Sequence, residues 1–133
     1  MRLALTIGLF FACVTPALAA ALTAEEAKET FFGFDMAGYV EGTDETWREC
    51  IKPTGRTVYW HDGIYQEGTL RIRDDAMLCF SYPDPETAAE SCFSATRVGS
   101  NWRFEYETQG GSTFITSQAR MVKACPTGVG PTS

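Results

Sequence analysis

The sequence has little of what a catalytic site or a nucleic-acid surface needs. Its 133 residues include one histidine, His61, and no serine in the G-x-S-x-G pattern that presents a nucleophile on a sharp turn. Lys and Arg number 11 against 17 Asp and Glu, so the formal net charge is -6. Binding to phosphate backbones or anionic membranes requires clustered basic residues. We therefore expect neither a nucleic acid nor a membrane surface as a partner.

An apolar run at residues 3–14 is too short to span a bilayer, which takes about 20 apolar residues. Arg2 precedes this run, and an A-x-A pattern follows it, ending at Ala19. These features predict a signal peptide over residues 1–19, followed by a single domain over residues 20–133. Acylation of Cys13 is a less favoured alternative, because Phe10-Phe11-Ala12 lacks the leucine and small residues of a lipobox.

A short helix is predicted at the start of the mature chain. Thr23 and Glu26 have the spacing of a capping box, in which each side chain accepts a hydrogen bond from the other residue's backbone N–H. Apolar residues then fall on one face, and Gly33 is a typical stop. We predict a helix over residues 24–32.

From Gly38 onward, short runs rich in Val, Thr, Tyr, Trp and Phe alternate with turn residues, which predicts antiparallel hairpins. A turn at Pro53-Thr54 would pair Trp47 with Trp60, and the Asp62-Gly63 turn would pair Trp60 with Tyr65. The apolar parity then changes, so a bulge is expected at Gly68.

Two later hairpins have a clearer register. A three-residue loop at residues 74–76 sets Ile72 opposite Leu78. A two-residue turn at Gly99-Ser100 places the apolar residues of both strands on one face. The resulting pairs are Phe93 with Tyr106, Ala95 with Phe104, and Arg97 with Trp102.

Four cysteines remain after the signal peptide, an even number that predicts two disulfides in an exported domain. The hairpin registers favour Cys79–Cys92, which leaves Cys50–Cys125. The pairings Cys50–Cys79 with Cys92–Cys125, and Cys50–Cys92 with Cys79–Cys125, stay open. The favoured pairing brings the early strands near a last strand at residues 120–125. We predict a mainly β fold, a single antiparallel meander of seven or eight strands forming a small lipocalin-like or protease-inhibitor-like barrel, with a frayed tail after about residue 126.

No metal or cofactor site is predicted. His61 precedes the Asp62-Gly63 turn, which explains it better as a solvated turn residue than as a general base. The acidic clusters at residues 74–75 and 84–86 do not match a calcium loop, and paired cysteines offer no thiolate. Two carboxylates converging from distant strands stay open as an alternative.

Aromatic residues are abundant and mostly fall on the predicted inner face. Packing of a small barrel explains them better than a pocket does. If a pocket exists, an aromatic-lined surface for an apolar or sugar-like ligand is expected. Arg97 lies on this otherwise apolar face next to Trp102, and three arrangements stay open: it stacks on the indole at the barrel rim, reaches an acid, or extends from a strand end to water. The candidate ligand-binding residues are Trp60, Tyr65, Arg97 and Trp102.

The strands Gly68-Thr69-Leu70 and Leu78-Cys79-Phe80-Ser81-Tyr82, followed by Cys92-Phe93, resemble a pattern in small secreted bacterial proteins of unknown function. In these proteins a G-x-W-like strand precedes a C-F-x-Y strand and a further cysteine. The resemblance covers roughly the middle third of the chain. It implies export and a β-rich single domain, and it assigns no residue roles.

We predict a periplasmic or secreted, non-catalytic binding or interaction module of the bacterial envelope, monomeric, with a protein or a small molecule as its partner. Export, disulfides, an acidic surface and the lack of a catalytic constellation favour this function. Three alternatives are an inhibitor of a periplasmic or secreted hydrolase, a small carboxylate-dependent hydrolase, and a structural envelope component.

Overall fold

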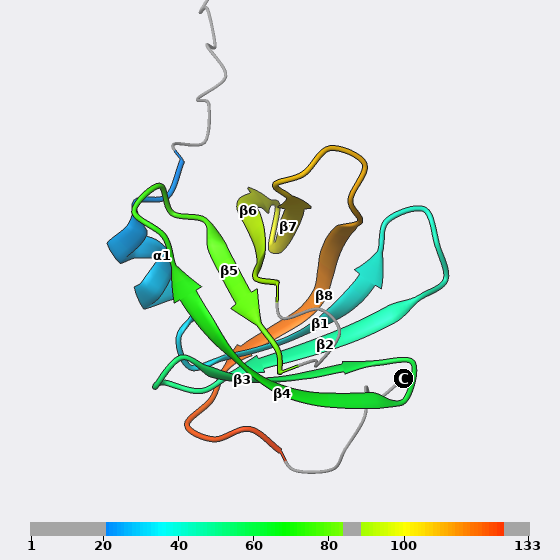
Figure 1. The fold of residues 1–133 in the computed structure, drawn as a ribbon, viewed down its shortest axis with the longest axis horizontal. Coiled ribbons are helices and arrows are strands. Elements are labelled where there is room, and N and C mark those ends of the chain that lie inside the picture. Colours follow the sequence, from blue (N-terminus) through cyan, green and yellow to red (C-terminus); the bar gives the residue numbers. More distant parts are fainter. Residues whose placement is uncertain (1–20, 84–88, 127–133) are drawn as a thin grey trace, which may run out of the picture.

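The computed structural model describes residues 21–83 and 89–126, which form an eight-stranded barrel and one short helix (Figure 1). Each strand pairs antiparallel with the next, and β8 pairs with β1 to close the barrel. This confirms the predicted mainly β meander with one N-terminal helix. In chain order the elements are α1 (Ala24–Phe31), β1 (Phe34–Val40), β2 (Thr46–Ile51), β3 (Arg56–His61), β4 (Ile64–Ile72), β5 (Leu78–Ser81), β6 (Ser91–Val98), β7 (Asn101–Tyr106) and β8 (Thr113–Met121).

Several predictions lie outside the described residues: the signal peptide over residues 1–19, the acidic cluster at residues 84–86 and the tail after about residue 126. Within the part of the chain that the structure describes, no helix combines the length and the apolar character of a membrane span.

Helix α1 closes one end of the barrel (Figure 1). The predicted capping box is present, with the Thr23 N–H donating to Glu26 Oε2 over 2.8 Å and the Glu26 N–H donating to Thr23 Oγ1 over 3.2 Å. Phe31 is fully buried, and its ring centroid lies 5.0 Å from that of Trp102 and 5.7 Å from that of Phe104. The first strand begins at Phe34, earlier than the predicted start of the β pattern at Gly38.

Both of the later hairpins have the predicted register. Leu78 lies opposite Ile72, and Trp102 lies opposite Arg97. Cys79 pairs with Cys92 across β5 and β6, and the disulfides are Cys79–Cys92 and Cys50–Cys125 as favoured. In these two hairpins the short turn fixes which residues of the two strands lie opposite each other, so the sequence predicts the register.

The predicted register between β2 and β3 is wrong by one residue. The Lys52 N–H donates to the carbonyl of Arg56 over 2.8 Å, so the loop has three residues, 53–55. Gly55 occupies the left-handed position of this loop, with φ of +84°. Trp47 therefore lies opposite His61 rather than Trp60. Because neighbouring residues of a strand face opposite sides of the sheet, this shift turns Trp60 to the outside of the barrel.

Gly68 is not at a bulge, which corrects another prediction. The pairing of β3 with β4 is continuous from Arg56–Thr69 to His61–Ile64. Trp60 and Tyr65 pair as predicted, but on the outer face, so no parity change remains to be absorbed. A Cβ at Gly68 would lie 2.5 Å from the Ser81 carbonyl oxygen and 2.5 Å from a Tyr82 ring carbon. Glycine at this position lets Tyr82 lie against β4.

The last strand, β8, ends at Met121, so the prediction of a strand at residues 120–125 is also wrong. The segment after β8 instead brings Val122 and Cys125 against Cys50, Val58 and Trp60 on the outer face. The Cys50–Cys125 disulfide thus fastens this segment to β2, while hydrogen bonds between β1 and β8 close the barrel.

Removing the two disulfides should have unequal effects on stability. The Cys50–Cys125 bridge spans 75 residues and the Cys79–Cys92 bridge spans 13. The chain-entropy model gives losses of about 4.5 and about 3 kcal/mol respectively. We expect the Cys50→Ala/Cys125→Ala variant to unfold at lower urea concentration than the Cys79→Ala/Cys92→Ala variant. The reverse order would show that local packing, rather than the length of the closed loop, determines the loss.

Candidate functional site

A cavity of about 210 Å³ opens into the barrel at the end away from α1. We call it the chamber. Its lining residues are Met36, Trp47, Glu49, Tyr59, Phe80, Tyr82, Ser91, Phe93, Phe104 and Phe114. This volume is below the roughly 300 Å³ of pockets for drug-sized ligands, but above the ~150 Å³ cavity that accommodates benzene in another protein. The chamber therefore has room for a one-ring molecule.

Aromatic rings that contact one another form most of the chamber wall. The Phe114 ring centroid lies 5.8 Å from that of Trp47 and 5.5 Å from that of Phe93, both nearly perpendicular. Tyr59 and Tyr82 form a further pair at 5.6 Å. Edge-to-face contacts of this kind are favourable beyond the area that they bury. They hold the rings of the wall in place.

Among residues 21–83 and 89–126, Glu49 is the one acid that lines the chamber. It lies on β2 between Trp47 and Ile51 and is 4% exposed. The Tyr82 hydroxyl donates a hydrogen bond to Glu49 Oε2 over 2.6 Å. Oε1 has no hydrogen-bond partner among the described residues, and no Lys or Arg of these residues lines the chamber.

Burial raises the pKa of Glu49 from its ordinary 4.5 to about 8, although the hydroxyls of Tyr82 and Thr57 act in the opposite direction. At neutral pH the carboxyl is therefore mostly protonated. Burial, followed by the nearby Glu49, also raises the pKa of both Tyr59 and Tyr82. Both tyrosines therefore keep their protons and remain hydrogen-bond donors.

The structure brings Trp60 and Tyr65 together, but outside the chamber. Trp60 is 2% exposed and lies under the Arg48 guanidinium, whose central carbon is 5.1 Å from the ring centroid. Tyr65 is 42% exposed and packs edge-on against Trp60 at 5.7 Å. The expectation that both face inward is wrong, because of the register shift described above.

Arg97 and Trp102 also form a pair, with the guanidinium carbon 5.1 Å from the indole centroid, which is the stacked arrangement among those left open. They line a separate groove of about 250 Å³ near α1, together with Leu22 and Ala76. The four predicted ligand-binding residues thus form two pairs in different places, and none of them lines the chamber.

His61 ends β3 and precedes the Asp62-Gly63 turn. Its Nε2 lies 3.9 Å from a Glu45 oxygen and 4.0 Å from an Asp62 oxygen, and its ring stacks on Tyr59 at 6.1 Å. Since both carboxylates are exposed, this is a solvated arrangement and not a buried base held by an acid.

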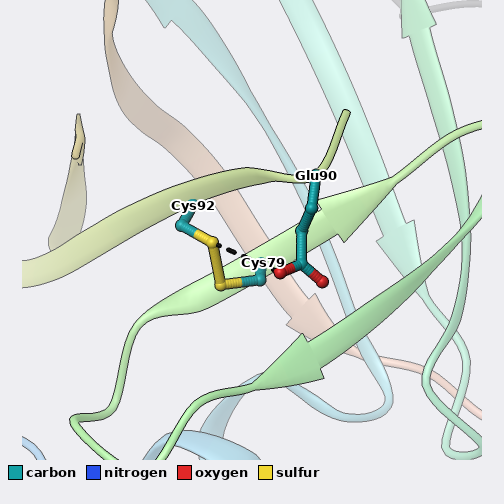
Figure 2. Close-up of side chains that lie close together, drawn as sticks. All are labelled: Cys79, Glu90 and Cys92. Atoms are coloured by element: carbon teal, nitrogen blue, oxygen red, sulfur yellow. Dashed lines mark hydrogen bonds between the residues drawn. A yellow bond between two sulfur atoms is a disulfide. The ribbon is translucent and has the colours of Figure 1, made fainter. Parts of the chain in front are cut away.

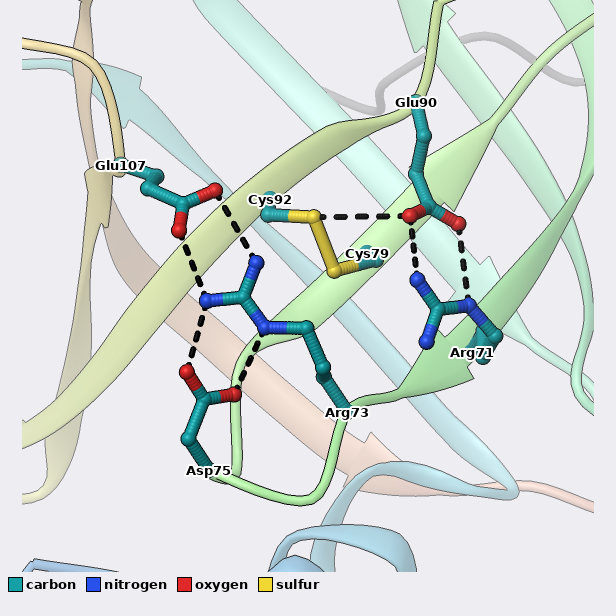
Figure 3. A network of polar contacts seen from close by, with 7 residues as sticks. All are labelled: Arg71, Arg73, Asp75, Cys79, Glu90, Cys92 and Glu107. Atoms are coloured by element: carbon teal, nitrogen blue, oxygen red, sulfur yellow. Dashed lines mark hydrogen bonds and ion pairs between the residues drawn. A yellow bond between two sulfur atoms is a disulfide. The ribbon is translucent and has the colours of Figure 1, made fainter.

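Cys79, Glu90 and Cys92 form the one group of three potential metal ligands among the described residues (Figure 2). Cys92 Sγ lies 3.7 Å from Glu90 Oε1, but the two sulfurs are bonded to each other. A disulfide has no thiolate to offer a metal. Arg71 holds Glu90 through both carboxylate oxygens, so the carboxylate is already neutralised (Figure 3).

A second arginine continues this layer of ion pairs over the outer face. Arg73 donates to Asp75 and to Glu107, with its Nη2 at 2.6 Å and 2.7 Å from the respective oxygens (Figure 3). The group around the Cys79–Cys92 disulfide is therefore a set of satisfied charges on the surface. It contrasts with Glu49, which is buried and has no cationic partner among the described residues.

The sequence analysis missed Glu49, although a signal was present. In the run Trp47-Arg48-Glu49-Cys50-Ile51, strict alternation puts Glu49 on the same face as two large apolar residues. An acid at such a position is either buried or marks a strand end. Its hydrogen-bond partner, Tyr82, follows β5 and is distant in the sequence.

The raised pKa of Glu49 predicts how stability depends on pH. Between pH 4.5 and about 8 the folded protein retains a proton that the unfolded chain releases. The free energy of unfolding should therefore fall as the pH rises through this window, by up to about 5 kcal/mol from this residue.

We expect Glu49→Gln to remove most of this slope and to raise the urea midpoint at pH 8, with the exposed Glu25→Gln as the control. If the slope persists in Glu49→Gln, the residue does not titrate in this range.

Comparisons with known proteins add no relative. No protein-family model, no curated protein and no solved structure matches the chain. The resemblance to small secreted bacterial proteins therefore stays a prediction.

Proposed function

We propose that this protein is an exported, non-catalytic binding module that holds a small, largely apolar ligand in the chamber. The observation that carries the proposal is a cavity of about 210 Å³ with aromatic walls and, among the described residues, one carboxyl group, that of Glu49, with no cationic neighbour in the lining. Ligand sites typically combine an apolar lining with very few polar groups that fix orientation. The volume limits the ligand to about one ring.

The two disulfides indicate an oxidising, extracytoplasmic location. Together with the predicted signal peptide, they favour a periplasmic or secreted protein. The acidic composition adds a preference for neutral or cationic ligands over anionic ones.

The chamber fits binding better than hydrolysis. Glycoside hydrolysis needs two carboxyl groups about 5–9.5 Å apart. Among the described residues, Glu49 is the one carboxyl that lines the chamber, and no imidazole joins it. Glu49 is a hydrogen-bonding group at the wall, and the Tyr82 hydroxyl orients one of its oxygens.

Toluene, a one-ring apolar probe, should bind the chamber. We expect toluene to shift the side-chain NMR signals of Trp47, Phe93 and Phe114 in the protein lacking residues 1–19, with a dissociation constant in the millimolar range or tighter.

The substitution Ser91→Phe should abolish the shifts, because it places a ring in the chamber, where Ser91 lies. The control Ser117→Phe adds a ring at an exposed position of β8 and should leave the shifts unchanged. Absence of shifts in the unsubstituted protein, or equal shifts in Ser91→Phe, would overturn the proposed function.

A further inference from the structure

Two acids are buried in the described part of the chain, and they differ in whether a cationic side chain contacts them. Asp35 is 5% exposed and Glu49 is 4% exposed. Arg48 donates to both oxygens of Asp35 over 2.9 and 2.7 Å, and Arg120 donates to Oδ2 over 3.1 and 3.0 Å. Burial acts to raise the pKa of Asp35, but these hydrogen bonds and charges outweigh it and lower the pKa.

Glu49 has no such counter-charge within the part of the chain that the structure describes. The groups that face it are the hydroxyls of Tyr82, which follows β5, and of Thr57 and Tyr59 from β3. Further out, Glu45 and Asp62 lie near Tyr59 and are also acidic, and His61 stacks on that ring. A buried carboxylate without a cation is costly, so the empty protein keeps Glu49 protonated.

The walls of the chamber favour positive charge as well. The faces of aromatic rings carry partial negative charge and attract cations within about 6 Å. Trp47, Tyr59, Tyr82 and four phenylalanines line the same cavity as Glu49. The described lining of the chamber therefore combines a carboxyl group with aromatic rings, both of which can contact an ammonium ion.

We infer that the ligand carries a protonated amine, which pairs with the Glu49 carboxylate while its apolar body packs against the aromatic wall. This inference rests on the proposed function and names the chemical class of the ligand. On binding, the O–H bond of the Glu49 carboxyl breaks, its proton passes to solvent, and the ammonium N–H donates to the carboxylate. No electrons are transferred.

Benzylamine and benzyl alcohol form a matched pair of probes, because they share one ring and a CH₂ group and differ in charge. We expect calorimetric titration of the protein lacking residues 1–19 at pH 8 to show benzylamine binding at least about tenfold more tightly. Glu49→Gln should weaken benzylamine by at least about tenfold and change benzyl alcohol by less than about threefold.

Glu45→Gln is the control, because it removes an exposed acid just before β2 and should keep the preference for the amine. If benzyl alcohol binds as tightly as benzylamine, or if Glu49→Gln keeps the preference, the inference is overturned while the proposed function stands. If neither probe nor toluene binds, the proposed function fails with it.

The pH dependence gives a second and independent readout. Because the carboxyl must release its proton, the affinity for benzylamine should rise by up to about tenfold per pH unit from pH 6 and level off near pH 8. Titrations in buffers of different ionisation enthalpy should show up to one proton released below pH 8. A flat profile for benzylamine, or the same rise for benzyl alcohol, would contradict the pairing with Glu49.

Discussion

The insertion of Phe31 into one end of the barrel joins helix α1 to the wall of the chamber. Helix α1 has eight residues, too few to be stable alone in water. It is held by the burial of Ala27 and Phe31 and by the edge-on contacts of Phe31 with Trp102 and Phe104. Phe104 contacts the Phe31 ring and also lines the chamber. The helix thus packs, through Phe31, against a residue that forms part of the chamber wall.

The outer face carries the restraints that let the interior keep an open space. Asp35 on β1 joins Arg48 on β2 and Arg120 on β8, so one ion-pair cluster spans the seam where the barrel closes. The Cys50–Cys125 disulfide draws the final segment over Trp60. Because these contacts lie outside, they stabilise the strand arrangement without filling the chamber. A protein restrained in this way can tolerate a buried acid that has no cationic partner among the described residues.

The hairpins show what sequence can and cannot determine in a small barrel. Gly99-Ser100 and Asp62-Gly63 allow essentially one register each, so their cross-strand pairs were predictable. The register across residues 53–55 was not predictable, because glycine is common both at the last position of a four-residue turn and at the left-handed position of a three-residue loop. One residue of difference moved Trp60 to the outside. The chamber was missed for a further reason: its lining residue Tyr82 follows β5 and lies close to Gly68 of β4, a contact that no local pattern predicts.

The contrast between Asp35 and Glu49 also explains how the chamber would select among molecules of one size. A ligand carboxylate would face the carboxyl of Glu49 at short range, and either the two repel or one must hold a proton. A neutral one-ring ligand gains only van der Waals contact with the chamber wall. A one-ring ammonium gains the same contact, the attraction of the aromatic faces for its positive charge, and an ion pair with Glu49. Above pH 8 the empty protein carries a buried carboxylate without a cation, which lowers its free energy of unfolding. A bound ammonium would remove this penalty, so it should raise the free energy of unfolding most in that pH range.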